Sequence, residues 1–206
     1  KVVKDLNIIT GDIRDQDFIT NHTKKIDTIM HLAALIGIPY SYHAPKSYID
    51  TNITGTYNIL NAAKINNVSK TIITSTSEVY GTAQSIPIRE SHSLNAQSPY
   101  AASKIAADQL ALSFYRSFNL PITIIRPFNT YGPRQSSRAV IPTIITQILK
   151  NEKVQLGSLN PTRDFTYVDD TISGMMSAIN NKKSIGEIIN IGSGHEISIA
   201  KLYQII

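Results

Sequence analysis

The chain has 206 residues, a formal net charge of +5 and no cysteine, and 42% of its residues are hydrophobic. This composition is typical of a globular chain of one domain or slightly more, and it excludes disulfide scaffolds and thiolate zinc sites. No metal site is expected. The apolar runs are much shorter than the ~20 residues of a membrane span, and basic residues are scattered rather than clustered with aromatics. We therefore expect a soluble, cytoplasmic protein that binds neither membranes nor nucleic acid.

Five short runs rich in Ile and Val predict β-strands, at residues 7–10, 28–32, 71–74, 122–126 and 187–191. Most of them do not alternate with polar residues, which is typical of strands buried on both faces of a parallel sheet. The segments between them include residues 48–66 and 99–118, where apolar residues recur at helical spacing. Strands that alternate with helices indicate a doubly wound α/β fold.

The character of the chain changes after Arg126, where prolines and glycines become frequent. Such breaks are typical of a smaller, irregular lobe. We expect a first domain over residues 1–132, and a partial substrate-binding lobe over 133–206 that also returns segments to the main sheet. The chain starts with Lys1 and ends in a helix-like stretch, so we expect a fragment of a longer protein.

Tyr100 and Lys104 are four residues apart, which places them on one face of a helix. A free tyrosine has a pKa near 10, and a neighbouring ammonium group lowers the pKa of a phenol. Such a pair could remove a proton from a sugar or alcohol hydroxyl. The same spacing also occurs where a surface Tyr and Lys simply share a helix face.

Other polar segments follow the predicted strands. After residues 71–74, Thr76 and Glu78 could supply a hydrogen-bond donor and a separate base, or they could cap a helix. Asp12 could accept from an adenine amino group or cap the next helix. The small residues after His31 would let a flat ring approach, or they are ordinary core. Arg126 and Arg163 stand beside turns and suit phosphate contacts, or they are solvated surface charges.

Taken together and in this order, these segments resemble those of extended short-chain dehydrogenases/reductases, the NAD-dependent sugar-nucleotide epimerases and dehydratases. The matching pieces are GDIRD, HLAA, TNITGTYNIL, TSTSEVYG, YAASK, RPFNTYGPR and RDFTYVDD. The resemblance covers essentially the whole chain. It implies a Rossmann-type sheet, NAD as cofactor, a nucleotide-diphospho-sugar as substrate, and a homodimer formed through the helices 48–66 and 99–118.

The resemblance also assigns residues. Tyr100 matches the catalytic base and Lys104 its partner on the nicotinamide ribose, and Thr76 matches the hydroxyl that holds the substrate O4. The cofactor positions are Asp12, Ile13, Leu32, Ala33, Ala34 and Asn52, together with Tyr100 and Lys104. The substrate positions are Asn129, Arg138, Arg163 and Asn190, with Asn129 matching a phosphate contact. Tyr40, Tyr42 and His43 could line the sugar pocket or pack against the lobe.

Two departures from the family pattern stand out. The Gly-rich dinucleotide loop is absent from the sequence, so the resemblance implies that an upstream β-α-β unit is missing and that NAD binding is in doubt. The end of the substrate lobe is also cut short.

The residues around Thr76 suggest which reaction follows the shared oxidation at C4. Glu78 matches the base of 4,6-dehydratases, whereas simple 4-epimerases need no base there. Ser77 stands where some dehydratases have Asp as the acid and others have Ser. Segments 37–43, 97–104 and 129–135 resemble the legionaminic-acid-pathway dehydratases, which act on a nucleotide-linked N-acetylglucosamine. The sequence therefore favours an NDP-N-acetylglucosamine 4,6-dehydratase. A UDP-sugar 4-epimerase, a UDP-glucuronate-type decarboxylase and a non-catalytic dinucleotide-binding regulator remain open.

Overall fold

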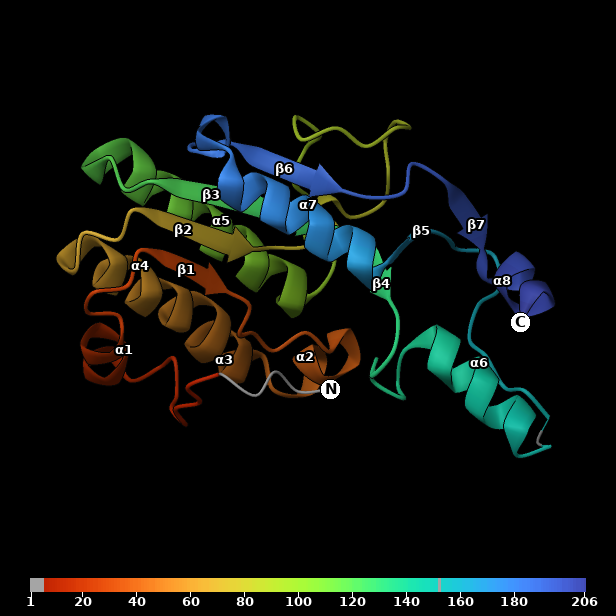
Figure 1. The fold of residues 1–206 in the computed structure, drawn as a ribbon. Helices are drawn as coiled ribbons and strands as arrows, with labels where there is room; N and C mark the ends of the chain where they lie inside the picture. Colours follow the sequence, from red (N-terminus) through yellow and green to blue (C-terminus); the bar gives the residue numbers. More distant parts are fainter. Residues whose placement is uncertain (1–5, 152) are drawn as a thin grey trace.

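A computed structural model describes residues 6–151 and 153–206 of the chain. Its main sheet has four parallel strands in the order β1-β2-β3-β6. They are β1 (Thr28–His31), β2 (Lys70–Thr74), β3 (Ile122–Pro127) and β6 (Ile188–Ile191). All four carboxyl ends lie at the same edge, as the arrowheads in Figure 1 show. The predicted doubly wound parallel sheet is confirmed.

Helices cover both faces of this sheet. On one face, α1 (Gln16–His22), α4 (Gly55–Ile65) and α5 (Pro99–Phe118) pack on a core that includes Ile73 and Ile124. On the other face, α7 (Val168–Asn180) packs over Ile72 and Ile125. Adjacent residues of one strand thus pack into cores on opposite faces of the sheet. This explains why the strand sequences are continuous apolar runs.

The helix predicted over residues 48–66 is built in three parts. It begins as α3 (Pro45–Tyr48), widens into the π-helix η1 (Ile49–Thr54), and continues as α4. A short helix α2 (Ile38–His43) precedes it. The π-helix turns the buried Asn52 toward the interior, where its amide contacts the chain after β1. π-Helical turns are rare in proteins, and those that occur are often found at functional sites.

A smaller lobe lies beyond the carboxyl ends of the main sheet (Figure 1). Its sheet has the order β4-β5-β7, with β4 parallel and β7 antiparallel to β5. Its elements are β4 (Asn129–Tyr131), α6 (Val140–Leu149), β5 (Thr162–Tyr167), β7 (Glu196–Ser198) and α8 (Ile199–Ile205). After β5 the chain returns to the main sheet through α7, the 3-10 turn η3 (Lys182–Ser184) and β6. The main sheet therefore includes a strand from the second predicted region, residues 133–206.

One predicted strand is wrong. Residues 7–10 form no strand and are exposed, although their sequence favours β-structure. A strand needs a neighbour with which to share its backbone hydrogen bonds, and no other described segment pairs with these residues.

In the described part of the chain, no helix is long and apolar enough to cross a membrane.

Candidate active site

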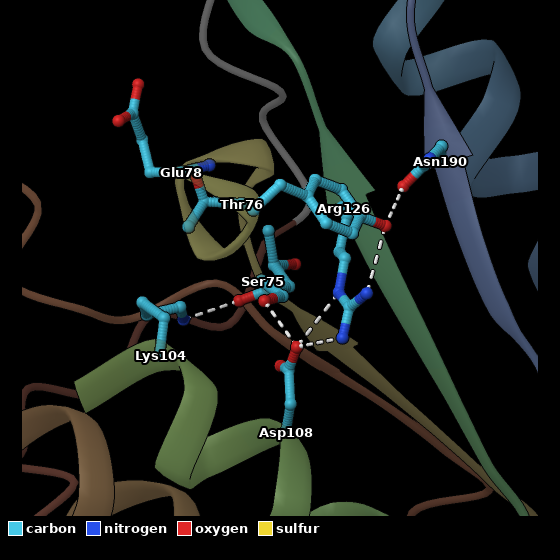
Figure 2. Close-up of polar contacts among 9 residues, drawn as sticks. Ser75, Thr76, Glu78, Lys104, Asp108, Arg126 and Asn190 are labelled. Carbon is cyan, nitrogen blue, oxygen red and sulfur yellow. Dashed lines mark hydrogen bonds and ion pairs between the residues drawn. The ribbon is translucent and has the colours of Figure 1, made fainter. Parts of the chain in front are cut away.

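The segment that leaves β2 carries three of the predicted catalytic residues. Thr76 caps the 3-10 turn η2 (Ser77–Tyr80), because its side chain accepts a hydrogen bond from the Glu78 backbone N–H at 3.2 Å. Thr76 is therefore a capping residue, and this role leaves its hydroxyl hydrogen free to donate. Ser77 and Glu78 are half-buried in this turn. Figure 2 shows the Glu78 carboxylate turned away from the buried cluster around Asp108.

Helix α5 brings the other two residues to the same place. Ser98 caps the helix by accepting from the Ala101 N–H at 3.0 Å, and Pro99 occupies the first turn. Tyr100, Lys104 and Asp108 follow at four-residue intervals, so they line one face of the helix, and all three are buried. A surface location for the Tyr–Lys pair is therefore excluded.

The expectation that Lys104 lowers the pKa of Tyr100 is wrong for this structure. Burial raises the pKa of Tyr100 to about 12, and the nearby Glu78 carboxylate adds to that effect, whereas a hydrogen bond from Thr76 opposes it. The Lys104 ammonium instead donates to the Thr74 carbonyl oxygen at 2.6 Å. Burial also lowers the pKa of Lys104, and the carboxylate of Asp108 partly restores it. Tyr100 is thus held as a neutral phenol.

A buried polar network lies behind these residues (Figure 2). Asp108 accepts hydrogen bonds from the Ser75 hydroxyl at 2.9 Å and from Arg126 Nε at 3.0 Å. Arg126 also donates to the Tyr80 hydroxyl at 2.9 Å, and Tyr80 donates to Asn190 Oδ1 at 2.7 Å. Arg126 is therefore neither a phosphate ligand nor a solvated charge, contrary to both predictions, because its side chain is 1% exposed and paired with Asp108.

Two further polar residues organise the floor of the site. Asn52 donates to the Leu35 carbonyl and to the Ser103 hydroxyl, both at 2.9 Å, and accepts from the Leu35 N–H at 2.8 Å. The side-chain amide of Asn52, a predicted cofactor residue, is thus hydrogen-bonded within the protein. Tyr48 donates to the Gly37 carbonyl at 2.5 Å and packs its ring edge-on against Tyr100, with 6.2 Å between ring centroids.

The remaining predicted cofactor residues are exposed or half-buried, and they lie before α1 and after β1. Asp12 pairs with Arg14, which lowers the pKa of Asp12 to about 2. Asp12 does not cap α1, because Asp15 does so by accepting from the Phe18 N–H at 2.9 Å. Ile13 is half-buried under α4, where its side chain meets Gly55.

The residues after β1 expose apolar side chains. Leu32 is 59% exposed and Ile36 is 69% exposed, and the small Ala33 and Ala34 stand between them. Large exposed apolar side chains beside small ones form a surface that a flat ring system can cover.

Three of the four predicted substrate residues lie in the lobe, and the fourth, Asn190, lies in β6 of the main sheet. Asn129 is half-buried in β4, while Arg138 before α6 and Arg163 in β5 are exposed. Arg163 donates to the Thr162 carbonyl. Asn190 in β6 is engaged by Tyr80 and by the Ile88 carbonyl at 3.2 Å. The three side chains predicted to line the sugar pocket or to pack against the lobe are all exposed, namely Tyr40, Tyr42 and His43.

Comparisons with known proteins identify the family of the chain. A family model for GDP-mannose 4,6-dehydratase matches residues 1–206. A dTDP-D-glucose 4,6-dehydratase of Dictyostelium discoideum is 36% identical over 96% of this chain, which covers 49% of that protein. A dTDP-glucose 4,6-dehydratase of Streptomyces venezuelae, solved with NAD bound, superposes with a TM-score of 0.94 at 32% identity, over 99% of this chain and 63% of that one.

An epimerase superposes almost as well. The UDP-N-acetylglucosamine 4-epimerase of Methanobrevibacter ruminantium gives a TM-score of 0.88 at 35% identity, over 98% of this chain and 66% of that one. The chain thus spans about half to two thirds of the length of these relatives. Nearly the whole chain thus superposes on proteins named as sugar-nucleotide dehydratases and epimerases. The chain belongs to the GDP-mannose 4,6-dehydratase family, within the extended short-chain dehydrogenases/reductases.

Proposed function

We propose that this protein is an NAD-dependent 4,6-dehydratase of a nucleotide-diphospho-sugar, with NDP-N-acetylglucosamine as its substrate. The observation that carries the proposal is the place of Glu78. Its carboxylate follows the Thr76 hydroxyl by two residues in η2 and is near enough to raise the pKa of Tyr100. Oxidation at C4 needs only Tyr100 and Thr76, so Glu78 is available for a second step.

In this mechanism Thr76 binds O4 of the sugar, and Tyr100 removes the proton from the C4 hydroxyl. NAD, when bound, accepts the hydride from C4 and supplies it again at the end. The C4 ketone acidifies the C5 hydrogen, and Glu78 removes that proton. The C6 hydroxyl then leaves with a proton as water, assisted by the Ser77 hydroxyl. Hydride adds at C6 and a proton at C5, so the product differs from the substrate by the loss of one water.

Tyr100 must lose its proton before it can act as a base. The Lys104 ammonium makes one hydrogen bond within the described chain, to Thr74, so two of its N–H groups remain for the nicotinamide ribose and the phenol oxygen. In this proposal Lys104 turns one of these N–H groups to the phenol oxygen when the ligands bind, and that hydrogen bond favours the phenolate.

For the cofactor, we propose that Asp12 and Ile13 hold adenine, and that Leu32, Ala33 and Ala34 lie under the rest of the dinucleotide. Asn52 acts indirectly, because it fixes the backbone of Leu35.

For the substrate, we propose that Asn129, Arg138, Arg163 and Asn190 face the nucleotide diphosphate and its base. N-acetylglucosamine is favoured by the likeness of segments 37–43, 97–104 and 129–135 to dehydratases of that sugar.

A 4-epimerase is the second candidate, because an epimerase of a UDP-linked N-acetyl sugar superposes on the chain. In that case Glu78 has no role in turnover. A uronic acid decarboxylase is the third candidate, and a non-catalytic dinucleotide-binding regulator is the fourth.

Mass spectrometry of UDP-N-acetylglucosamine incubated with the protein and NAD separates these candidates. We expect a product lighter by one water, no product with Tyr100→Phe, and no loss of water with Glu78→Gln. An unchanged mass with inverted C4 stereochemistry by NMR would identify an epimerase and refute the dehydratase. With a UDP-uronic acid, loss of carbon dioxide would identify the decarboxylase.

We also propose a homodimer formed through η1, α4 and α5. Ile49, Tyr57 and Phe118 are apolar side chains on these helices and are 40–51% exposed. Tyr57 packs against Phe114 with 6.2 Å between ring centroids, which extends the apolar surface from α4 to α5. Light scattering should show a dimer for the native protein and a monomer for Tyr57→Asp. A native monomer at micromolar concentration would exclude this interface.

A further inference from the structure

The buried ion pair between Asp108 and Arg126 contacts both ends of the segment Ser75–Tyr80, which carries Thr76, Ser77 and Glu78. Oδ2 of Asp108 accepts from Ser75 Oγ, and it also binds Nε and Nη2 of Arg126 at 3.0 and 2.9 Å. Nη1 of Arg126 donates to the Tyr80 hydroxyl. Figure 2 shows Asp108 reaching up from α5 to Ser75 and to the Arg126 side chain, which comes from β3.

At the first end, three contacts fix the backbone just before Thr76. The Ser75 N–H donates to the Ile125 carbonyl at 2.7 Å, which continues the hydrogen bonding between β2 and β3. The Ser75 hydroxyl donates to Asp108, and the Thr74 carbonyl accepts from Lys104. The direction of the Thr76 hydroxyl therefore depends on contacts that α5 makes with its two preceding residues.

At the second end, Tyr80 is fully buried and is held by two side chains. Its hydroxyl accepts from Arg126 and donates to Asn190 Oδ1, and the guanidinium carbon lies 5.0 Å from its ring centroid. The turn then ends at Gly81, whose φ is +65° and where a Cβ would lie 2.4 Å from the Asn95 carbonyl oxygen. Only glycine fits this close approach.

Between these ends the segment has little support of its own. The hydrogen bonds at the two ends of η2 are long, at 3.2 Å for Glu78 N to Thr76 Oγ1, 3.5 Å for Val79 N to Thr76 O, and 3.3 Å for Gly81 N to Glu78 O. Bonds of this length are weak. The positions of Thr76 and Glu78 therefore depend on where Ser75 and Tyr80 are held, together with the buried Val79, whose carbonyl accepts from the Asn95 N–H at 2.9 Å.

We propose that Asp108 and Arg126 are positioning residues that set the places of Thr76 and Glu78 relative to Tyr100. This inference rests on the proposed function for its kinetic part, because it assigns Ser75 to the C4 step and Tyr80 to the C5 step. A role in stability alone is a poor explanation for the pair, because buried ion pairs are often replaceable by apolar residues without loss of stability.

The test compares Ser75→Ala, which removes the contact at the first end, with Tyr80→Phe, which removes the contact at the second. Asp108→Asn weakens both, and Thr123→Val is the matched control. Thr123 lies in the same strand as Arg126, and its buried hydroxyl donates to the Ser184 carbonyl at 2.8 Å and makes no hydrogen bond to the 75–80 segment. Hydrogen exchange of the amides of residues 75–81 measures positioning without any turnover. We expect faster exchange in the first three variants and no change in Thr123→Val.

The kinetic readouts are C4 oxidation, followed by the absorbance of the reduced nicotinamide, and deuterium incorporation at C5 from heavy water. With UDP-N-acetylglucosamine and NAD, Ser75→Ala should slow C4 oxidation by about 10-fold, because small misplacements of a positioning group have effects of this size or larger. Tyr80→Phe should leave C4 oxidation unchanged and slow C5 exchange by about 10-fold. Asp108→Asn should slow both steps.

Slowing of C4 oxidation by Tyr80→Phe as large as that by Ser75→Ala would mean general loosening and would overturn the inference. Unchanged amide exchange over residues 75–81 would overturn it too. These outcomes differ from failure of the proposed function, in which the native protein itself shows no C5 exchange. If the native protein proves to be an epimerase, amide exchange and the effect of Ser75→Ala on C4 oxidation still decide whether the segment is positioned as inferred.

Discussion

The histidine at the end of β1 makes the stability of the protein depend on pH in a way that can be calculated. His31 is 4% exposed, and its Nε2 lies 3.0 Å from Thr56 Oγ1. Thr56 uses its single O–H to donate to the Asn52 carbonyl at 2.6 Å, so Nε2 of His31 must carry the proton that it donates to Thr56. Burial lowers the pKa of His31 from 6.5 to about 4, and the Lys104 ammonium adds to this effect.

The sign follows from linkage. The unfolded chain binds a proton on His31 below pH 6.5, whereas the folded protein resists protonation until about pH 4, so the folded state loses stability as the pH falls between these values. At pH 5 the loss is about 2 kcal/mol, and it levels off at about 3 kcal/mol below pH 4. Solvent screens this effect little, because the ring is buried.

Urea denaturation of the native protein and of His31→Gln, at pH 8 and pH 5, measures this loss. Glutamine keeps an N–H donor for Thr56 but cannot be protonated. Far-UV circular dichroism is the suitable signal because the chain has no tryptophan. Groups other than His31 titrate equally in both proteins, so we expect the native protein to lose about 2 kcal/mol more than the variant. The reasoning is refuted if the two proteins lose the same free energy of unfolding between these pH values.

Two further predictions concern Lys70 at the start of β2 and Asp164 in the lobe. Lys70 is buried at the start of β2, where four oxygen atoms, including the carbonyls of Ala178 and Asn181 at the end of α7, lie 2.6–3.0 Å from its Nζ. Lys70→Met should lower the free energy of unfolding by about 3 kcal/mol, because it leaves buried carbonyls unpaired; a loss below about 1 kcal/mol by urea denaturation would contradict this. In the lobe, Asp164 accepts from the backbone N–H groups of Ser193 and Gly194 at 2.9 and 2.8 Å. Asp164→Ala should speed hydrogen exchange at these two amides by about 10-fold or more, and unchanged exchange would show that the loop is held by other contacts.

Local patterns in the sequence predict the regular parts of the fold well. The strands β1, β2, β3 and β6 and the helix α5 follow from apolar runs and helical spacing, because each is decided by burial along one element. Residues 7–10 have an equally good strand pattern and form none, since pairing depends on a neighbour that a local pattern does not contain. The π-helical turn at Ile49–Thr54 has no simple pattern either.

The candidate active site also combines residues that the sequence predicts with residues that it does not. Tyr100, Lys104, Thr76 and Glu78 can be predicted because their spacing and their place after strands carry chemical meaning. Asp108 is not among the predicted residues, although it continues the four-residue spacing of Tyr100 and Lys104 and is therefore detectable. The partner of Arg126 could not be predicted, because the two charges are 18 residues apart and meet only when α5 packs on the sheet.

The π-helix restricts the number of residues between Tyr48 and α4 as well as their types. One residue fewer in Ile49–Thr54 would let ordinary α-helical hydrogen bonds form throughout, but it would rotate everything before it by about 100° relative to α4. Tyr48 would then lose its ring contact with Tyr100, and the Asn52 side chain would no longer reach the backbone of Leu35. A single-residue deletion in the middle of this helix should therefore be as damaging as the loss of a buried side chain. Among relatives, alignment gaps should be placed outside this turn.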